Sequence, residues 1–311
     1  MNHINELLKS YSIDETSPVE LLRESADNIV YAVGKKNKSI LRISKRLPVQ
    51  DLQFEFAVSE HLAKNGFPVP EWIKTRDGKT FIRDDDAAAA LFVFLDGYKA
   101  KADKNNLPNR DQCRTAGRNL ALLHNLGLNF RTDFPRRRNI FTEFERAIGK
   151  RDVFIGQFES GRKFIGQVEN AVKFACESKE INGLIHNDFR PDNVIFKNDG
   201  EISGVIDFDW SCCGPVVKDL ALAVAEWSFP DGHEGADLEL FDSFLEGYNS
   251  IAENKYKRGQ LLYSWIEFAT LSDACTYFCD LADDKTSDKK VIKSYMYKKY
   301  LYFYNMRRQI S

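Results

Sequence analysis

The stretch that decides the fold is GLIHNDFRPDNVIFKNDGEISGVIDFDW, residues 183–210. Within it VIFK alternates apolar and polar residues, NDG is a turn signal, and ISGVI is a second apolar run, which together predict a β-hairpin. Folding the chain about Gly200 places Asn193 opposite Asp207 at the open end of this hairpin. Asp188 lies on the loop that enters it, so the sequence gathers one amide and two carboxylates in one place.

These residue types suit a magnesium site beside a proton acceptor. Directly opposed side chains of an antiparallel pair have Cβ atoms about 4.5–5.5 Å apart, so Asn193 and Asp207 are expected to share one Mg²⁺ ion. Phosphate oxygens and water would complete its coordination. Asp188 is placed to accept a proton from an attacking hydroxyl. His186 is interpreted as an orienter of this loop, and Asp219 either caps the next helix or ties the loop down.

The same residues carry a family resemblance. HNDFRPDN matches the H-x-D-x-x-x-x-N catalytic loop, IDFDW takes the place of the metal-binding Asp segment of kinases, and GPVVKDLA follows. The chain therefore resembles the aminoglycoside phosphotransferase and homoserine kinase-like family, small-molecule relatives of protein kinases. The resemblance implies Asp188 as catalytic base, with His186 and Asn193 in the same loop. It also implies Asn193 and Asp207 as magnesium ligands, with Asp209 assisting at a second metal.

The remaining pattern predicts an α+β, bilobal protein-kinase-like fold. IVYAV (29–33), SILRI (39–43) and AAAALFVFL (87–95) read as strands, and helical spacing recurs in 52–66. Residues 5–25 are expected to form a helix. The expected organisation is a small strand-rich lobe over residues 1–95, a hinge at 96–98 and a larger helical lobe over 99–311.

Arg42 occupies the strand position where kinases carry a phosphate-binding Lys, and Glu55 is its expected helical partner. Guanidinium can hold phosphate or carboxylate through two hydrogen bonds. The alternative is an exposed strand Arg in a surface ion pair. Lys45 is a second candidate for the cation, and Glu60 for the carboxylate.

The resemblance also implies ATP as the phosphate donor. No G-x-G-x-x-G precedes the second strand, so Ser25 to Asn28 are expected to close over the phosphates, which makes Asn28 a nucleotide contact. Phe92 to Leu95, with Phe94 among them, are expected to supply the adenine pocket and the hinge. Core packing explains this apolar strand equally well.

The acceptor is expected to be a hydroxyl of a small molecule, of amino alcohol, homoserine-like or aminoglycoside and sugar type. Residues 261–274 contain Glu267 and Asp273 but no Arg, which favours a cationic or polyhydroxyl compound over homoserine. Trp227 and Trp265 are read as core residues that could also line the pocket. An acidic set provides either a pocket rim or a solvated loop: Asp231, Glu234, Asp237 and Glu239.

Composition limits the other possibilities. A formal net charge of −2 over 311 residues provides no basic field for nucleic acid or an anionic membrane. No apolar run approaches the roughly 18 residues of a membrane span. The six cysteines contain no C-x-x-C pair and suit packing in a reducing compartment, so the cytoplasm is the expected location. Monomer and homodimer both remain open.

Two other functions remain as alternatives. A Ser/Thr protein kinase of the same fold would need a substrate platform between Asp207 and Asp219, where only residues 208–218 lie. A nucleotide-binding scaffold without catalysis is compatible with Arg42 in place of Lys, but not with an intact set of Asp188, Asn193 and Asp207.

Overall fold

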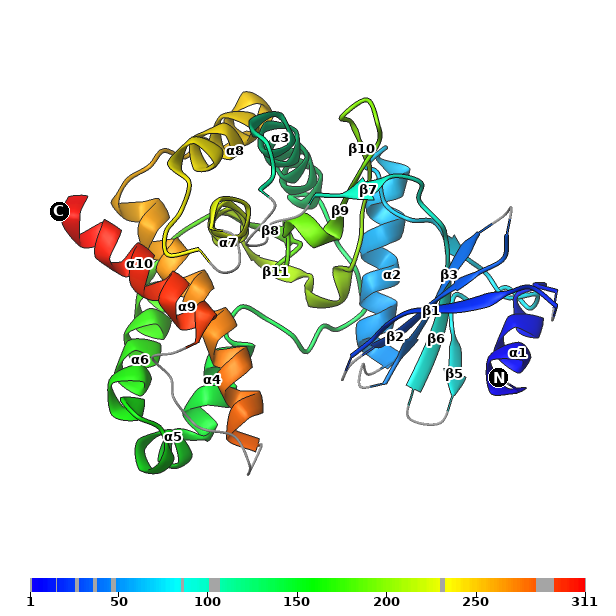
Figure 1. Ribbon diagram of the computed structural model, residues 1–311, viewed down its shortest axis with the longest axis horizontal. Helices are drawn as coiled ribbons and strands as arrows, with labels where there is room; N and C mark the ends of the chain where they lie inside the picture. Colours follow the sequence, from blue (N-terminus) through cyan, green and yellow to red (C-terminus); the bar gives the residue numbers. More distant parts are fainter. Residues whose placement is uncertain are drawn as a thin grey trace.

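The computed structural model describes residues 2–14, 16–25, 28–35, 38–45, 49–84, 87–100, 107–229, 233–283 and 294–310. A strand-rich lobe and a helical lobe lie side by side, and in the view of Figure 1 the helix α2 lies between them. The predicted division into a strand-rich front and a helical remainder is confirmed.

The strand-rich lobe is built on one antiparallel sheet with the strand order β1-β2-β3-β6-β4, and β5 pairs with the other end of β6. Because successive side chains of a strand point to opposite faces, β6 serves two cores. Ala89 and Leu91 pack with α1, whereas Ala90 and Phe92 pack with Leu52 of α2. The elements of this lobe are α1 (Asn2–Ser10), β1 (Val19–Glu24), β2 (Asn28–Val33), β3 (Ser39–Ser44), α2 (Val49–Lys64), β4 (Trp72–Ile73), β5 (Ile82–Asp84) and β6 (Ala87–Val93).

The helix expected over residues 5–25 is wrong in its second half. The helix ends at Ser10, and β1 begins at Val19. Between them the Asp14 carboxylate accepts a hydrogen bond from the Thr16 backbone at 2.8 Å, a local turn that competes with helix. Pro18 then disfavours helical backbone in the residue before it, so the chain enters a strand instead.

The connection between the lobes runs close to the hairpin of residues 194–205. After β6 the chain leaves the first sheet. It then forms β7 (Tyr98–Lys99), which pairs with β9 (Val194–Phe196). Gly97 has φ +146°, and a Cβ atom there would lie 2.3 Å from the Phe196 carbonyl oxygen, so only glycine fits. We therefore propose residues 96–98 as the hinge, with lobes at 1–95 and 99–311.

The helical lobe is organised around α7, which packs on α8 and α9. Trp227 of α7 and Trp265 of α9 are fully buried, as expected for core residues. In the described part of the chain, no helix is long and apolar enough to cross a membrane. The further elements are α3 (Arg110–Gly127), α4 (Thr142–Gly149), α5 (Arg151–Gln157), α6 (Gly161–Glu177), β8 (Asn182–Ile185), β10 (Ile202–Val205), β11 (Cys212–Pro215), α7 (Val216–Ser228), α8 (Leu238–Ile251), α9 (Gln260–Asp283) and α10 (Tyr295–Ile310).

Candidate active site

The predicted hairpin is present, but its expected register is wrong by one residue. Val194 pairs with Val205 and Ile195 with Gly204, after which a bulge at Ser203 shifts the pairing. Asn193 consequently lies opposite Ile206, whose backbone N–H donates to the Asn193 carbonyl at 2.9 Å. A bulge adds one residue to one strand only, and the residue alternation does not reveal it.

Asp207 nevertheless joins the site because of its backbone. A slip of one residue would send its side chain to the other face of a regular strand. Asp207 instead has φ +68° and starts the short 3₁₀ helix Phe208–Trp210. Together with Asn193 and Asp209 it lines a cavity of about 670 Å³ that residues of both lobes enclose.

Asp219, in the first turn of α7, fixes the loop that enters the hairpin. Its two carboxylate oxygens accept hydrogen bonds from the backbone N–H groups of His186 at 2.8 Å and Asn187 at 2.7 Å. A third contact joins Oδ2 to Nε2 of His124 at 3.0 Å. Burial alone would raise the pKa of Asp219, but the hydrogen bond to His124 and the charges of His124, His186 and Lys218 together lower it. Of the two expected roles, the carboxylate therefore ties the loop down.

His186 joins the same loop to the end of β10. Its Nε2 lies 3.0 Å from the Ile206 carbonyl, and its Nδ1 accepts from the Asp188 backbone N–H at 3.3 Å. Burial lowers the pKa of His186, which favours the neutral ring with its proton on Nε2. Both ring nitrogens are thus used to hold backbone, in keeping with the orienting role proposed for this residue.

Asp188 points into the cavity with its carboxylate held at both oxygens. Oδ1 accepts from Nε of Arg190 at 2.6 Å, and Oδ2 accepts from Nδ2 of Asn193 at 2.9 Å. Burial raises the pKa of Asp188, although the nearby Arg190 opposes that rise. Each oxygen keeps acceptor capacity for a further proton donor.

Asp207 and Asp209 form a pair of carboxylates without an ion pair among the described residues, and only the more distant charge of Arg42 opposes the rise in the pKa of Asp207. Burial and then Asp209 raise the pKa of Asp207 well above its ordinary value. Asp209 Oδ2 accepts from Nδ2 of Asn28 at 3.1 Å, whereas Oδ1 is buried without a hydrogen-bond partner among the described residues. An orphaned buried oxygen beside a second carboxylate fits a divalent cation.

The expected ligand set contains only two carboxylates, because its third member is the amide of Asn193. Accordingly, the described residues contain no group of three His, Cys, Asp or Glu side chains arranged for a metal. A Mg²⁺ ion usually keeps several water or phosphate ligands, so two carboxylates and an amide are a sufficient protein contribution.

Arg42 is buried, so the interpretation as an exposed surface residue is wrong. Its Nη1 and Nη2 donate to the two carboxylate oxygens of Glu55 at 2.8 and 2.7 Å. Nε is buried without a partner, and the side chain lines the same cavity as Asp188. The second candidates lie at the surface, where Lys45 pairs with Glu24 and Glu60 with Lys64.

The residues expected to contact the nucleotide line the larger cavity. Phe94 and Leu95 line it, together with Ser25 and Asn28 from the turn between β1 and β2. Residues 26–27, which belong to the segment expected to cover the phosphates, lie outside the described residues. Asn28 contacts Asp209 and accepts a hydrogen bond from Ser44 at 2.9 Å, so it connects the two lobes across the site.

Arg136, which the sequence did not single out, holds the segment that carries Asp207 and Asp209. The side chain is 5% exposed and lies 3.4 Å from the Asp51 carboxylate in the first turn of α2. Its Nε donates to the Ser211 carbonyl at 2.9 Å, and its Nη2 donates to the Asp209 carbonyl. One guanidinium thus joins the helix that carries Glu55 to the segment that carries the acidic pair.

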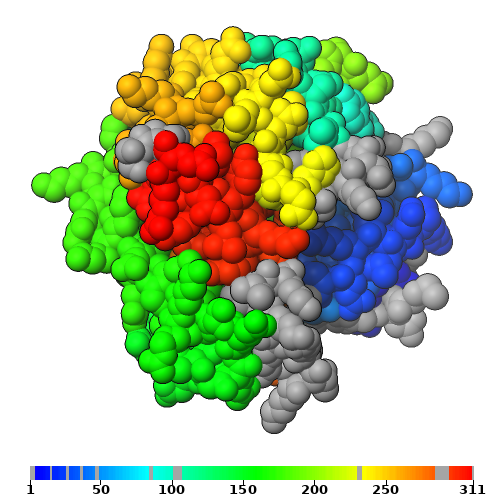
Figure 2. Space-filling model, turned by 60° about the vertical axis from the view of Figure 1, so that its left-hand side comes forward, coloured from blue at the N-terminus to red at the C-terminus, as the bar shows by residue number. Residues whose placement is uncertain are grey.

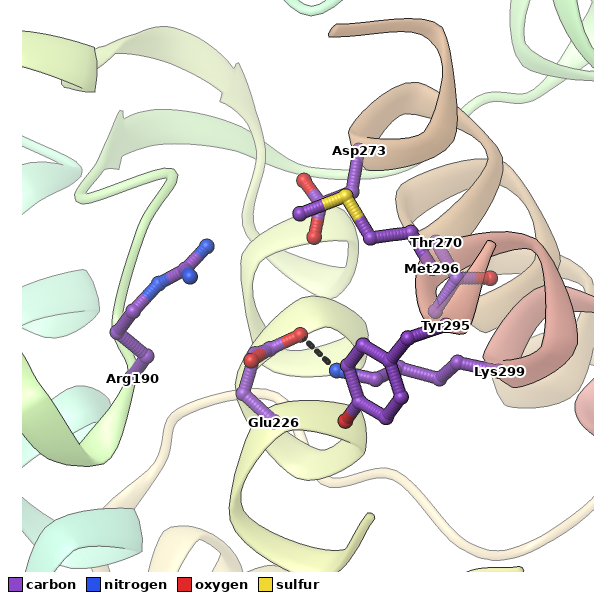
Figure 3. A pocket seen from close by; sticks show the side chains of 7 residues that line it. All are labelled: Arg190, Glu226, Thr270, Asp273, Tyr295, Met296 and Lys299. Atoms are coloured by element: carbon purple, nitrogen blue, oxygen red, sulfur yellow. Dashed lines mark hydrogen bonds and ion pairs between the residues drawn. The ribbon is translucent and has the colours of Figure 1, made fainter. Parts of the chain in front are cut away.

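A second cavity, of about 80 Å³, adjoins the first at Arg190, which lines both (Figure 3). Glu226 of α7 and Lys299 of α10 form an ion pair in it, and the two side chains are 12% and 4% exposed. Asp273 of α9 faces the same space. Its remaining lining residues are Thr270, Tyr295 and Met296.

The structure places the residues that the sequence offered for acceptor binding. The cations absent from residues 261–274 come from elsewhere, as Arg190 and Lys299. Neither Trp227 nor Trp265 lines this second cavity. The acidic set has structural roles: Asp237 caps α8, Glu239 pairs with Arg110 and Glu234 with Lys298, while Asp231 lies outside the described residues.

Comparison with known proteins follows this geometry. The model of the phosphotransferase enzyme family matches residues 18–260. The chain belongs to the phosphotransferase enzyme family. Homoserine kinase of Methylobacterium radiotolerans is 30% identical over 253 residues, which cover 79% of this chain and 75% of that protein. Homoserine kinase of Hyphomonas neptunium is 29% identical over 261 residues, which cover 79% and 74%.

Solved structures confirm the protein-kinase-like fold of this phosphotransferase. A microcompartment-associated aminopropanol kinase superposes with a TM-score of 0.74 at 19% identity over 99% of this chain and 96% of that one. An amicoumacin kinase in complex with AMP-PNP and Ca²⁺ superposes with a TM-score of 0.70 at 17% identity, covering 94% and 87%. The prediction of a phosphotransferase with an alcohol group as acceptor is confirmed at the level of the family.

Proposed function

We propose that this phosphotransferase transfers the γ-phosphoryl group of ATP, bound with Mg²⁺ between the lobes, to a hydroxyl of a small molecule. The observation that carries the proposal is the convergence of Asp188, Asn193, Asp207 and Asp209 with Arg42 on one cavity. The amicoumacin kinase relative, solved with AMP-PNP and Ca²⁺, supports a nucleotide and a divalent cation in such a fold.

The donor occupies the larger cavity. Phe94 and Leu95 line it and would contact the adenine, and Arg42, which lines the same cavity, supplies a guanidinium charge for the phosphates. Asn193, Asp207 and Asp209 are the residues that would hold Mg²⁺. When bound there, the cation supplies positive charge that neutralises the phosphates and the buried carboxylate pair.

Asp188 acts on the acceptor. Its carboxylate accepts the proton of the acceptor hydroxyl as that oxygen forms a bond to the γ-phosphorus, and the bond from phosphorus to the β–γ bridging oxygen breaks to release ADP. Arg190 and Asn193 fix the orientation of the carboxylate through the bonds at 2.6 and 2.9 Å. Its raised pKa makes it a better proton acceptor than an ordinary aspartate.

The structure offers no support to a protein substrate. After Asp209 the described chain enters β11, which pairs with β8, and α7 begins at Val216. Residues 208–218 therefore form part of the fold instead of an extended platform for a peptide. The adjoining cavity of about 80 Å³ suits the head group of a small molecule.

The decisive test is ADP release from ATP, measured with and without Mg²⁺ over a panel of small hydroxyl compounds. Homoserine heads the panel because the relatives are homoserine kinases. We expect turnover that needs both Mg²⁺ and an acceptor and that Asp188→Asn abolishes. ATP binding without phosphoryl transfer to any acceptor would refute the proposal and favour the scaffold.

A further inference from the structure

The residue immediately before the proposed base has an unusual backbone conformation. Asn187 has φ +65°, in the left-handed region that residues other than glycine seldom adopt, and it is buried. Its backbone N–H donates to Oδ1 of Asp219 at 2.7 Å. Because the backbone angles of Asn187 set the direction in which the chain continues into Asp188, the contacts that hold Asn187 also aim the carboxylate of Asp188.

The side-chain amide of Asn187 contacts two other segments of the chain. Its Oδ1 accepts a hydrogen bond from Nζ of Lys218 in α7. Its Nδ2 donates to the Trp210 carbonyl at 3.1 Å. An ammonium group can only donate and a carbonyl can only accept, so this orientation of the amide is the one that satisfies both neighbours. One buried side chain thus joins the loop that carries Asp188 to α7 and to the end of the 3₁₀ helix Phe208–Trp210.

The Trp210 carbonyl belongs to the segment that carries the acidic pair. Asp207 precedes the 3₁₀ helix and Asp209 lies within it. The proposed reaction needs the base beside the acceptor hydroxyl and the metal beside the phosphates, at one fixed separation. A misplacement of about 1 Å can lower a rate about 10²-fold. The hydrogen bond from Asn187 to Trp210 directly connects the two parts whose separation matters.

Lys218 is the buried cation that holds the amide oxygen. The residue is 3% exposed, and its ammonium group donates to the neutral side chain of Asn187. Its charge also acts on Asp219 and Asp273. A buried ammonium group is costly unless it is hydrogen-bonded, and Oδ1 of Asn187 would in turn lack this donor without Lys218. The two side chains therefore stabilise one another.

The contact between Lys218 and Asn187 lies in the interior of the helical lobe. The helix α7 packs on α8 and α9, and α9 packs in turn on α10, which lies across the middle of one face of the molecule (red in Figure 2). Neither Asn187 nor Lys218 lines the larger or the smaller cavity. Both residues can therefore act on a reaction in these cavities only through the residues that they hold.

We infer that Asn187, held by Lys218, is a positioning residue of the proposed phosphoryl transfer: its amide fixes the proposed base relative to the acidic segment. The inference rests on the proposed function, because it assigns a role in that reaction. The test is the rate of ADP release with Mg²⁺ and ATP, measured with homoserine or with the compound of the panel that the wild type phosphorylates fastest. Titration calorimetry with ATP and Mg²⁺ measures binding, and urea denaturation measures stability.

Asn187→Asp separates activity from folding. Aspartate has the shape of asparagine and tolerates the left-handed backbone. One carboxylate oxygen pairs with Lys218, whereas the other meets the Trp210 carbonyl, so that two acceptors face each other. We expect kcat to fall at least about 10-fold while the affinity for ATP stays at the wild-type value, the pattern of a misplaced base.

Asn187→Gly and Asn187→Ala distinguish the amide from the backbone. Glycine adopts φ +65° without strain but supplies no side-chain contact, whereas alanine has neither advantage. We expect kcat at least about 10-fold below the wild type in both, and the lowest urea midpoint of the three Asn187 variants in Asn187→Ala. Ser160 provides the control, since it is exposed, has φ +60° and caps α6 without a side-chain hydrogen bond. Ser160→Gly should leave kcat unaltered.

Lys218→Met tests whether the cation acts through the amide, because methionine keeps the length of the side chain and removes the donor. We expect kcat to fall in Lys218→Met. Asn187→Gly combined with Lys218→Met should have the kcat of Asn187→Gly alone, within about twofold, because no amide is left for the cation to hold. Losses that multiply in the double variant would overturn the role of Lys218.

The outcomes separate this inference from the proposed function. Wild-type kcat in Asn187→Asp or Asn187→Gly, or a change confined to the urea midpoint, overturns the positioning role and leaves the kinase in place. The absence of transfer from the wild type to any small hydroxyl compound overturns both.

Discussion

The buried pair of Arg42 and Glu55 allows the role of the arginine in nucleotide binding to be separated from its role in stability. The two side chains are 9% and 4% exposed and share two hydrogen bonds of 2.8 and 2.7 Å. Glu55→Gln leaves a buried guanidinium without its counter-charge. Loss of one partner of such a pair costs about 3–5 kcal/mol in the free energy of unfolding.

Urea denaturation followed by circular dichroism measures this loss. With a slope near 3 kcal/mol/M, the upper end for urea, the midpoint falls by about 1 M or more in Glu55→Gln. Arg42→Lys keeps the charge but loses one arm of the fork, which costs about 1.5–3 kcal/mol. The control is Glu60→Gln on the same helix, whose exposed pair with Lys64 contributes at most about 1 kcal/mol.

Replacing both Arg42 and Glu55 separates the contribution of the pair to stability from the contribution of Arg42 to ATP binding. Arg42→Met combined with Glu55→Leu removes both charges and should recover most of the stability. It should not recover ATP affinity, measured by titration calorimetry, if Nε of Arg42 contacts the phosphates. Wild-type stability in Glu55→Gln would refute the energetic argument, and wild-type ATP affinity in the double variant would refute the phosphate contact.

Three further predictions concern the remaining parts of the site. Asp188→Asn should lower kcat by about 10²–10⁴-fold with ATP affinity retained, and wild-type kcat should fall as pH decreases through the raised pKa of Asp188, because only the carboxylate accepts a proton. Arg136→Lys loses hydrogen bonds to the backbone carbonyls of Asp209 and Ser211. It should therefore raise the Mg²⁺ concentration for half-maximal rate while acceptor KM stays constant. A change confined to thermal stability would show a merely structural role. Burial, reinforced by Glu226, raises the pKa of Asp273 to about 6, so acceptor KM should rise as pH falls below 6, and Asp273→Asn should abolish that dependence. The other charged groups that act on Asp273 are Arg190, Lys218 and Lys299.

The sequence could predict the parts of the site that local interactions determine. The hairpin, the loop with His186 and Asp188, and the strand with Arg42 all follow from alternation and short spacings. Glu55 was predicted as the partner of Arg42 from the resemblance to kinases, which pair a strand cation with a Glu of the next helix, and the two residues do pair. These contacts need no knowledge of how distant segments pack.

The rest depends on features that a residue pattern does not encode. The bulge at Ser203 and the positive φ of Asp207 both alter which side chains face the cavity; only the neighbouring Gly204 marks the first, and no glycine or asparagine marks the second. Asp219, which holds the loop, could be recognised in the motif. Whether it caps α7 or ties the loop down could be decided only from the position of α7. Glu226 and Lys299 are 73 positions apart and meet only through the packing of the helical lobe.

The candidate site contains one pair of neighbouring carboxylates, Asp207 and Asp209, at its larger cavity. Burial and then Asp209 raise the pKa of Asp207, whereas at the smaller cavity Arg190, Lys218 and Lys299 all act on Asp273. Elsewhere the chain neutralises its buried charges well, as in the pairs of Arg42 with Glu55 and of Lys299 with Glu226. A protein that pairs most buried charges and leaves Asp207 and Asp209 unpaired is complementary to a cation it does not itself contain. A divalent cation between Asp207 and Asp209, as proposed for this site, would compensate that pair.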